Sequence, residues 1–80
     1  MKLRTSSRRA AGRLELLDAQ LESYVNWRAE SRSVAESYRK WRHATNKQRR
    51  IAFDRYVAAL DREEVAACDY RRATELVHEA

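Results

Sequence analysis

The sequence predicts an all-α protein: a two-helix antiparallel hairpin, coiled-coil-like, that associates into a four-helix bundle. Three observations lead to this prediction. Proline is absent and glycine occurs once in 80 residues, whereas alanine occurs thirteen times, a composition that favours long helices. Large apolar residues recur at intervals of three, four or seven in two separate stretches. Between these stretches lies a short segment with residues that favour a helix end.

Residues 1–13 are expected to form a basic, mostly flexible N-terminal arm. They carry five basic residues and no acidic one, so the arm accounts for the whole net charge of +5. Ser7 is a good N-cap candidate, and the first helix can therefore extend back to it.

The first helix is predicted over residues 14–44. Its apolar stripe is interrupted by one weak turn, at Ser31, and consists of Leu14, Leu17, Leu21, Tyr24, Trp27, Val34, Tyr38 and Trp41.

The turn is predicted near residues 44–47. Thr45 and Gln48 fit a capping box, in which a Thr N-cap is followed three residues later by Gln. Asn46 is an alternative stop, because asparagine tolerates the left-handed conformation that ends helices. A single continuous helix of about 65 residues is the competing interpretation, since neither proline nor glycine interrupts the segment.

The second helix is predicted over residues 47–78. Its weak turn falls at Glu63 and Glu64, and its stripe consists of Phe53, Tyr56, Val57, Leu60, Ala67, Tyr70, Thr74 and Val77. With a turn centred near residue 47, the numbers of facing residues add to about 94, as for Trp41 and Phe53. The aromatic residues are interpreted as core rather than as a base-stacking set, because they follow the helical spacing.

The two weak turns face each other in this register. Ser31 would lie opposite Glu63 and Glu64, with Arg28 and Arg32 within reach of the two carboxylates. Such an ionic layer costs stability but can fix the register of a helix pair.

A second apolar strip is expected outside the seam, because two helices shield only one side of each other. This strip is the candidate protein interface, suited to a second copy or to another protein, with a homodimer as the simplest arrangement. It consists of Leu16, Val25, Ile51, Val65 and Leu76.

The basic residues of the arm and the turn are candidate polyanion contacts, because phosphate binding needs only clustered positive charge. Residues 39–50 carry six basic and no acidic residues, whereas the flanking segments 14–38 and 51–80 each have a net charge of −3. Solvated charge, or pairing of the turn with the acidic arms of another copy, explains the same pattern. The candidates are Lys2, Arg4, Arg8, Arg9, Arg13, Arg39, Lys40, Arg42, Lys47, Arg49 and Arg50.

The sequence offers no catalytic, cofactor or metal motif. Cys68, His43 and His78 are the chemically reactive side chains, and no CxxC, HExxH, GxSxG or glycine-rich phosphate loop accompanies them. We therefore expect neither an enzyme nor a bound cofactor or metal. A single cysteine is natural in a reducing compartment, and no apolar run is long enough to cross a membrane, so we expect a cytoplasmic protein without membrane contact.

Two stretches, YRKWRHA at 38–44 and AFDRYVAALDREEVAA at 52–67, resemble small helical proteins of unknown role from actinobacteria and their phages. Fourteen arginines against three lysines fit such a source. The resemblance implies a helical fold and no particular activity. The function expected from the whole sequence is a non-enzymatic protein–protein interaction module, a small adaptor or regulator. The alternative is a nucleic-acid-binding accessory protein that uses the arm and the turn.

Overall fold

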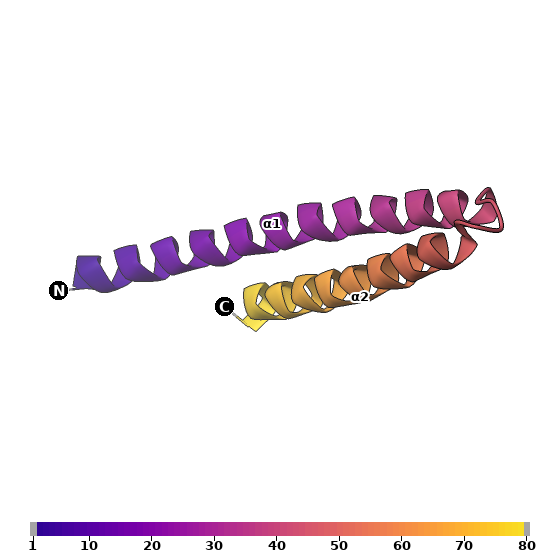
Figure 1. Ribbon diagram of the computed structural model, residues 1–80. Coiled ribbons are helices and arrows are strands. Elements are labelled where there is room, and N and C mark those ends of the chain that lie inside the picture. The colour runs from indigo at the N-terminus through magenta and orange to yellow at the C-terminus, as the bar shows by residue number, and fades with distance from the viewer. Residues whose placement is uncertain (1, 80) are drawn as a thin grey trace.

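The structure, a computed structural model, describes the backbone of residues 2–79 and the side chains of residues 12–79. Two helices, α1 (Lys2–Arg42) and α2 (Arg49–Glu79), pack against each other as an antiparallel hairpin (Figure 1). The chain measures 69 × 14 × 14 Å. The predicted hairpin is confirmed, and the competing single helix is excluded, because the chain reverses direction after Arg42.

The reversal occupies residues 43–48. The amide of His43 makes the last α-helical bond of α1, to the carbonyl of Arg39 at 3.1 Å. A tight turn follows, in which the amide of Gln48 donates to the carbonyl of Thr45 at 3.0 Å. The bond from Ala52 N to Gln48 O at 2.9 Å then opens α2. Thr45 therefore heads a separate turn, and α2 begins two residues later than the predicted residue 47.

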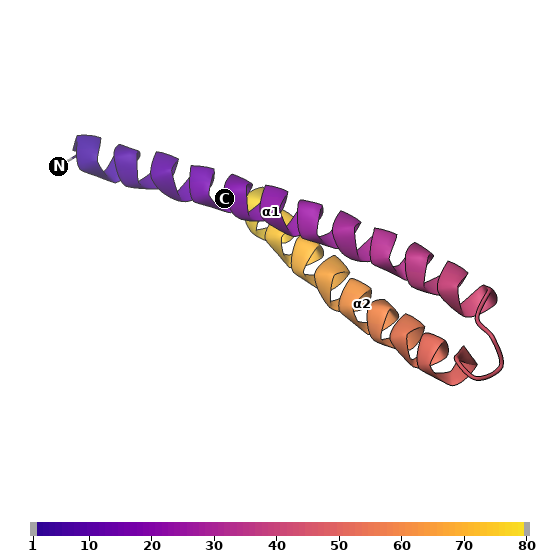
Figure 2. The ribbon, with the colours of Figure 1, turned by 45° about the horizontal axis from the view of Figure 1, so that its top comes forward.

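Helix α1 begins at Lys2, so it runs through the segment expected to be an arm. Its N-terminal end extends well past the C-terminal end of α2 in both views (Figures 1 and 2). Residues with high helix propensity dominate this segment, which explains why the helix continues. Met1 and the side chains of residues 2–11 lie outside the described part, so the contacts predicted for Lys2, Arg4, Arg8 and Arg9 do too.

The predicted register of the hairpin is confirmed by contacts along its length. The ring centroids of Trp41 and Phe53 are 5.2 Å apart, and the side-chain amide of Gln20 donates to the hydroxyl of Thr74 at 3.1 Å. Two further facing pairs, Tyr38–Tyr56 and Tyr24–Tyr70, have centroids 5.5 and 5.4 Å apart. In each pair the two residue numbers add to 94, as the sequence predicted.

The seam itself follows a stricter repeat than the predicted stripes. Its least exposed positions alternate spacings of four and three, which is the heptad pattern of a coiled coil. In α1 they are Leu16, Gln20, Ser23, Trp27, Glu30, Val34, Ser37 and Trp41, and Ala44 in the turn continues the same spacing. In α2 they are Ala52, Tyr56, Ala59, Glu63, Ala66, Tyr70, Ala73 and Val77. Small residues at these positions let the helices approach closely, so the seam takes fewer large side chains than predicted.

The core is correspondingly thin. Within the described residues, only Ala59 and Ala66 are fully buried, and no large side chain is. The larger seam residues, such as Trp27 and Trp41, are half-buried. Burial of apolar surface within the single hairpin therefore contributes little to its stability.

The middle of the seam is polar, but its pairing differs from the expected one. The indole N–H of Trp27 donates to a Glu63 carboxylate oxygen at 2.8 Å. The ion pair at this level joins Arg62 of α2 to Glu30 of α1 at 3.2 Å. Among the described residues, the ion pairs do not include Arg28 or Arg32, because the seam is rotated so that these two side chains lie outside it. The predicted ionic layer thus exists with different partners.

Candidate interaction surfaces

One side of the hairpin carries a series of exposed large apolar side chains, which we call the Leu/Tyr face. It is formed by the positions that flank the seam on the same side of both helices. All its large apolar side chains are substantially exposed, with Leu14 and Leu21 both at 62%. Its large apolar members are Leu14, Leu17, Leu21, Tyr24, Tyr38, Phe53, Val57 and Leu60.

The sequence assigned these eight residues to the seam between the two helices. The structure places them beside it, because an antiparallel pair has room at its contact for one heptad stripe from each helix. The signal that could have revealed this is the run of small residues Ala52, Ala59, Ala66 and Ala73, which recurs every seven positions. Such a run marks the line of closest helix approach and moves its large neighbours to the flank.

The Leu/Tyr face is grooved near the open end of the hairpin. Leu17, Leu21 and Tyr24 of α1 line one shallow depression together with Tyr70 of α2. A second depression beside it is lined mainly by Trp27, Ala67, Tyr70, Arg71, Thr74 and Glu75. Depressions floored by aromatic rings suit the insertion of apolar side chains from a partner helix.

Two aromatic clusters of nearly identical geometry lie along this face. In the first, Trp27 stacks on Tyr70 with centroids 5.6 Å apart and planes 9° apart, and Tyr24 packs on the edge of Trp27. In the second cluster, Trp41 stacks on Tyr56 with centroids 5.5 Å apart and planes 11° apart, and Tyr38 packs on the edge of Trp41. Corresponding residues are 14 positions apart, which is two heptads. The face therefore repeats the stacked Trp–Tyr pair and its flanking tyrosine, and only the second cluster adds a further ring, that of Phe53, 5.2 Å from Trp41.

The residues predicted as a protein interface do not gather on one strip. Leu16 is half-buried in the seam. Val25 is exposed on the outer side of α1, opposite the seam. Ile51 and Val65 lie on the side of α2 away from the Leu/Tyr face, where Val65 lines a depression with Asn26 and Asp69. Leu76 lies on the same side of α2 as Ile51 and Val65. The predicted interface residues are therefore divided between this side of α2, the outer side of α1 and the seam.

The basic residues of the turn form a strongly positive tip. Two of them have partners within α1: Lys40 lies 3.7 Å from Glu36, and Arg42 donates to the hydroxyl of Tyr38 at 3.2 Å. Arg39, Lys40 and Arg42 stand in the last turn of α1, where the helix dipole favours cations. Arg49 and Arg50 begin α2, where the same dipole disfavours them, so the helices alone do not explain these two arginines.

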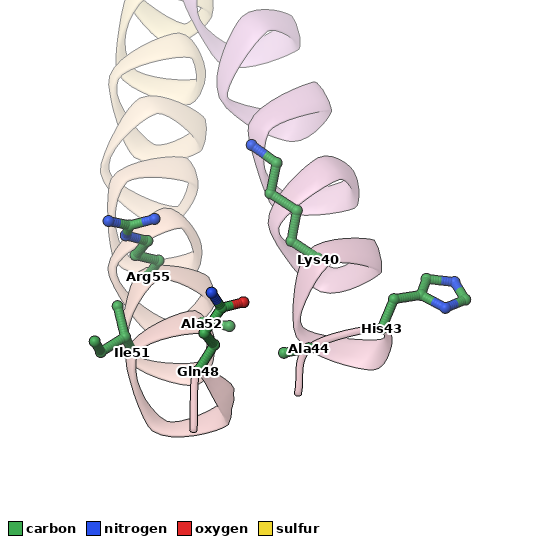
Figure 3. Close-up of a pocket in the computed structure, with 7 residues that line it drawn as sticks. All are labelled: Lys40, His43, Ala44, Gln48, Ile51, Ala52 and Arg55. Carbon is green, nitrogen blue, oxygen red and sulfur yellow. The ribbon is translucent and has the colours of Figure 1, made fainter. Parts of the chain in front are cut away.

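A groove at the tip is lined by Lys40, His43, Ala44, Gln48, Ile51, Ala52 and Arg55 (Figure 3). Its basic side chains do not converge. Figure 3 shows the His43 ring turned away from α2, while Lys40 and Arg55 extend along their own helices. Such an arrangement suits delocalised attraction of a polyanion more than specific binding of one small anion.

The reactive side chains are isolated from one another. Cys68 is exposed on α2, and no group of three or more metal-ligating side chains occurs among the described residues. Within the same part of the chain, neither helix has a stretch apolar enough to span a bilayer.

Comparisons with protein-family models, curated proteins and solved structures gave no match for this chain. The resemblance to small helical proteins of actinobacteria and their phages stays a prediction.

Proposed function

We propose that this protein is a non-enzymatic interaction module, a small helical adaptor or regulator that binds protein through its Leu/Tyr face. The observation that carries the proposal is the collection of eight exposed large apolar residues on one side of the hairpin. A set of exposed large apolar side chains of this kind is costly to leave in water and typically marks a protein-binding site.

The proposal includes the setting inferred from the sequence. A lone, exposed Cys68 suits a reducing cytoplasm, where it would not form unwanted disulfides. An actinobacterial or phage origin is part of the same proposal and rests on the composition and on the two stretches quoted above.

A matched pair of variants tests the proposed face. Leu21→Glu places a charge in the Leu/Tyr face, and Val65→Glu places the same charge on the other side at an almost equally exposed residue (62% and 61%). We expect tagged Leu21→Glu protein to lose proteins that the wild type captures from a lysate of the source organism, and Val65→Glu to retain them. Equal capture by both variants would contradict the assignment of this face. Far-ultraviolet circular dichroism of both variants controls for unfolding.

A nucleic-acid-binding accessory role is the second candidate function. It is favoured by Arg49 and Arg50, which stand in the first turn of α2, where the helix dipole disfavours cations. Clustered cations bind phosphates in a salt-dependent way.

Fluorescence-polarisation titration onto labelled duplex and single-stranded DNA and RNA tests this second role. If it operates, affinity falls steeply between about 50 and 200 mM salt, and Arg49→Glu with Arg50→Glu abolishes binding while Leu21→Glu does not. Absence of binding at low salt would exclude the tip as a phosphate contact.

A further inference from the structure

We infer that the Leu/Tyr face binds a second copy of this chain, in an antiparallel arrangement that puts each basic tip over the open end of the other hairpin. The inference rests on the proposed function and names the partner of the same face. It predicts a four-helix bundle in which α1 packs on α1 and α2 on α2 of the two copies.

The exposed area of the chain is the first reason. The single chain exposes 7017 Å², whereas a compact monomer of 9.5 kDa exposes about 5,000 Å². Part of the difference comes from the N-terminal end of α1, which extends past α2. A stable protein interface removes about 1,200–2,000 Å² from both partners together. The chain therefore exposes more surface than a compact monomer by an amount comparable with such an interface, and the eight large apolar residues of the Leu/Tyr face are part of that exposed surface.

The repeated aromatic clusters are the second reason. Tyr24 and Tyr38 lie equally far on either side of Ser31, and Tyr70 and Tyr56 lie equally far on either side of Glu63. Ser31 and Glu63 face each other in the observed register. A two-fold axis at this level, perpendicular to the helices, places each cluster of one copy over the other cluster of its partner. Such self-complementarity is what an isologous dimer requires.

The charge distribution is the third reason, and it selects the orientation. The tip, residues 39–50, has a net charge of +6, and the open end, residues 14–24 with 69–79, has a net charge of −4 with histidine neutral. The middle segments, 25–38 with 51–68, sum to −2. Antiparallel packing brings unlike ends together at both ends of the dimer, whereas parallel packing brings like ends together. This comparison of charges leaves out residues 1–13, because Met1 and the side chains of residues 2–11 lie outside the described part.

The first part of the test is a disulfide at the centre of the face. In a Cys68→Ser background, Ser31→Cys lies next to its own symmetry mate in the antiparallel dimer. Its matched control, Ser33→Cys, lies on the other side of α1. Under mild oxidation we expect the Ser31→Cys chain to form a covalent dimer at least tenfold faster than the Ser33→Cys chain. Equal rates would overturn the inference.

The second part measures the orientation. A spin label on Asn46→Cys in the same background reports the separation of the two tips by pulsed electron spin resonance. In the antiparallel dimer each label lies 15 residues from the two-fold axis, which gives a separation of about 45 Å at 1.5 Å per residue. Tips that lie side by side would give less than about 25 Å and would overturn the antiparallel arrangement.

The proposed function and the identity of its partner fail in different ways. A wild-type chain that sediments as a monomer at about 100 μM, while Leu21→Glu still abolishes capture of another protein, would overturn the second-copy inference and leave the proposed function intact. A monomer whose capture is equal in Leu21→Glu and Val65→Glu would overturn both. A dimer that Leu21→Glu dissociates and Val65→Glu does not would support both.

Discussion

The two stacked tryptophans differ in their hydrogen bonding, and the energetic effect of this difference can be measured. Trp27 and Trp41 have almost the same ring geometry, but the indole N–H of Trp27 also donates to Glu63 at 2.8 Å. Among the described residues, no such hydrogen bond is formed by Trp41. Replacing each tryptophan by phenylalanine keeps an aromatic ring in place and removes the N–H. The additional contact of Trp41 with Phe53, at 5.2 Å between centroids, works against the expected difference, so a larger loss in Trp27→Phe reports on the hydrogen bond.

The expected magnitudes follow from the contacts. Both substitutions remove roughly 40 Å² of partly buried apolar surface, which corresponds to about 1 kcal/mol. A hydrogen bond to a charged acceptor contributes about 1.5–3 kcal/mol, and the half-buried position of Glu63 places it at the lower end. We therefore expect Trp27→Phe to cost about 2.5 kcal/mol of unfolding free energy and Trp41→Phe about 1 kcal/mol.

Urea unfolding followed by circular dichroism at 222 nm measures the difference. All samples need the same protein concentration, because self-association would couple to unfolding. With a denaturant slope of about 1 kcal/mol/M for a chain of this size, the two midpoints should differ by about 1.5 M. Equal midpoints, or a larger loss in Trp41→Phe, would refute the role assigned to the Trp27–Glu63 bond.

Three further predictions concern packing and helix propensity. Ala59→Leu should overpack the seam at one of its fully buried positions and lower the unfolding free energy by about 1–3 kcal/mol. Ala58→Leu, one residue away and exposed, should change it very little in the same urea assay. Gly12→Ala should raise helix content and stability by about 0.5–1 kcal/mol, because a Cβ there would meet nothing within 4 Å; a loss of helicity in circular dichroism would contradict this. A double-mutant cycle on Glu30 and Arg62 should give a coupling under about 1 kcal/mol, because the arginine side chain is 55% exposed; coupling above about 2 kcal/mol would contradict it.

The sequence was sufficient to predict the hairpin and its register. The stop signals around Asn46 located the turn, and two apolar stripes of similar length then determined which residues face each other. Aromatic pairs such as Trp41–Phe53 and the Gln20–Thr74 hydrogen bond confirm that register. Register is predictable because it depends on chain length between facing residues, which the sequence gives directly.

The surfaces were harder to predict, because they depend on helix rotation. A rotation of about 100°, one residue on the helical wheel, exchanges a seam position for a flanking one. Leu60 and Ala67 were predicted to lie in the seam, whereas the structure buries their neighbours Ala59 and Ala66. The small residues determine this rotation, and a prediction based on large apolar side chains alone therefore places the seam one residue away.

The ionic layer was misassigned for the same reason. Arg28 and Arg32 are at the right level along the hairpin to reach Glu63 and Glu64, but they point away from the seam. Glu30 and Arg62, on the correct side, form the pair instead. The basic tip, in contrast, follows from the chain order alone, because every cation in residues 39–50 lies close to the turn whatever the helix rotation.

The most direct test of the central claim, that the Leu/Tyr face binds a second copy of this chain, is sedimentation equilibrium of three proteins between about 1 and 100 μM. The account predicts twice the monomer mass of 9.5 kDa for the wild type and for Val65→Glu, and the monomer mass for Leu21→Glu. A wild-type chain that remains monomeric over this range would contradict self-association. A dimer that Val65→Glu disrupts and Leu21→Glu does not would place the interface on the opposite side of the hairpin.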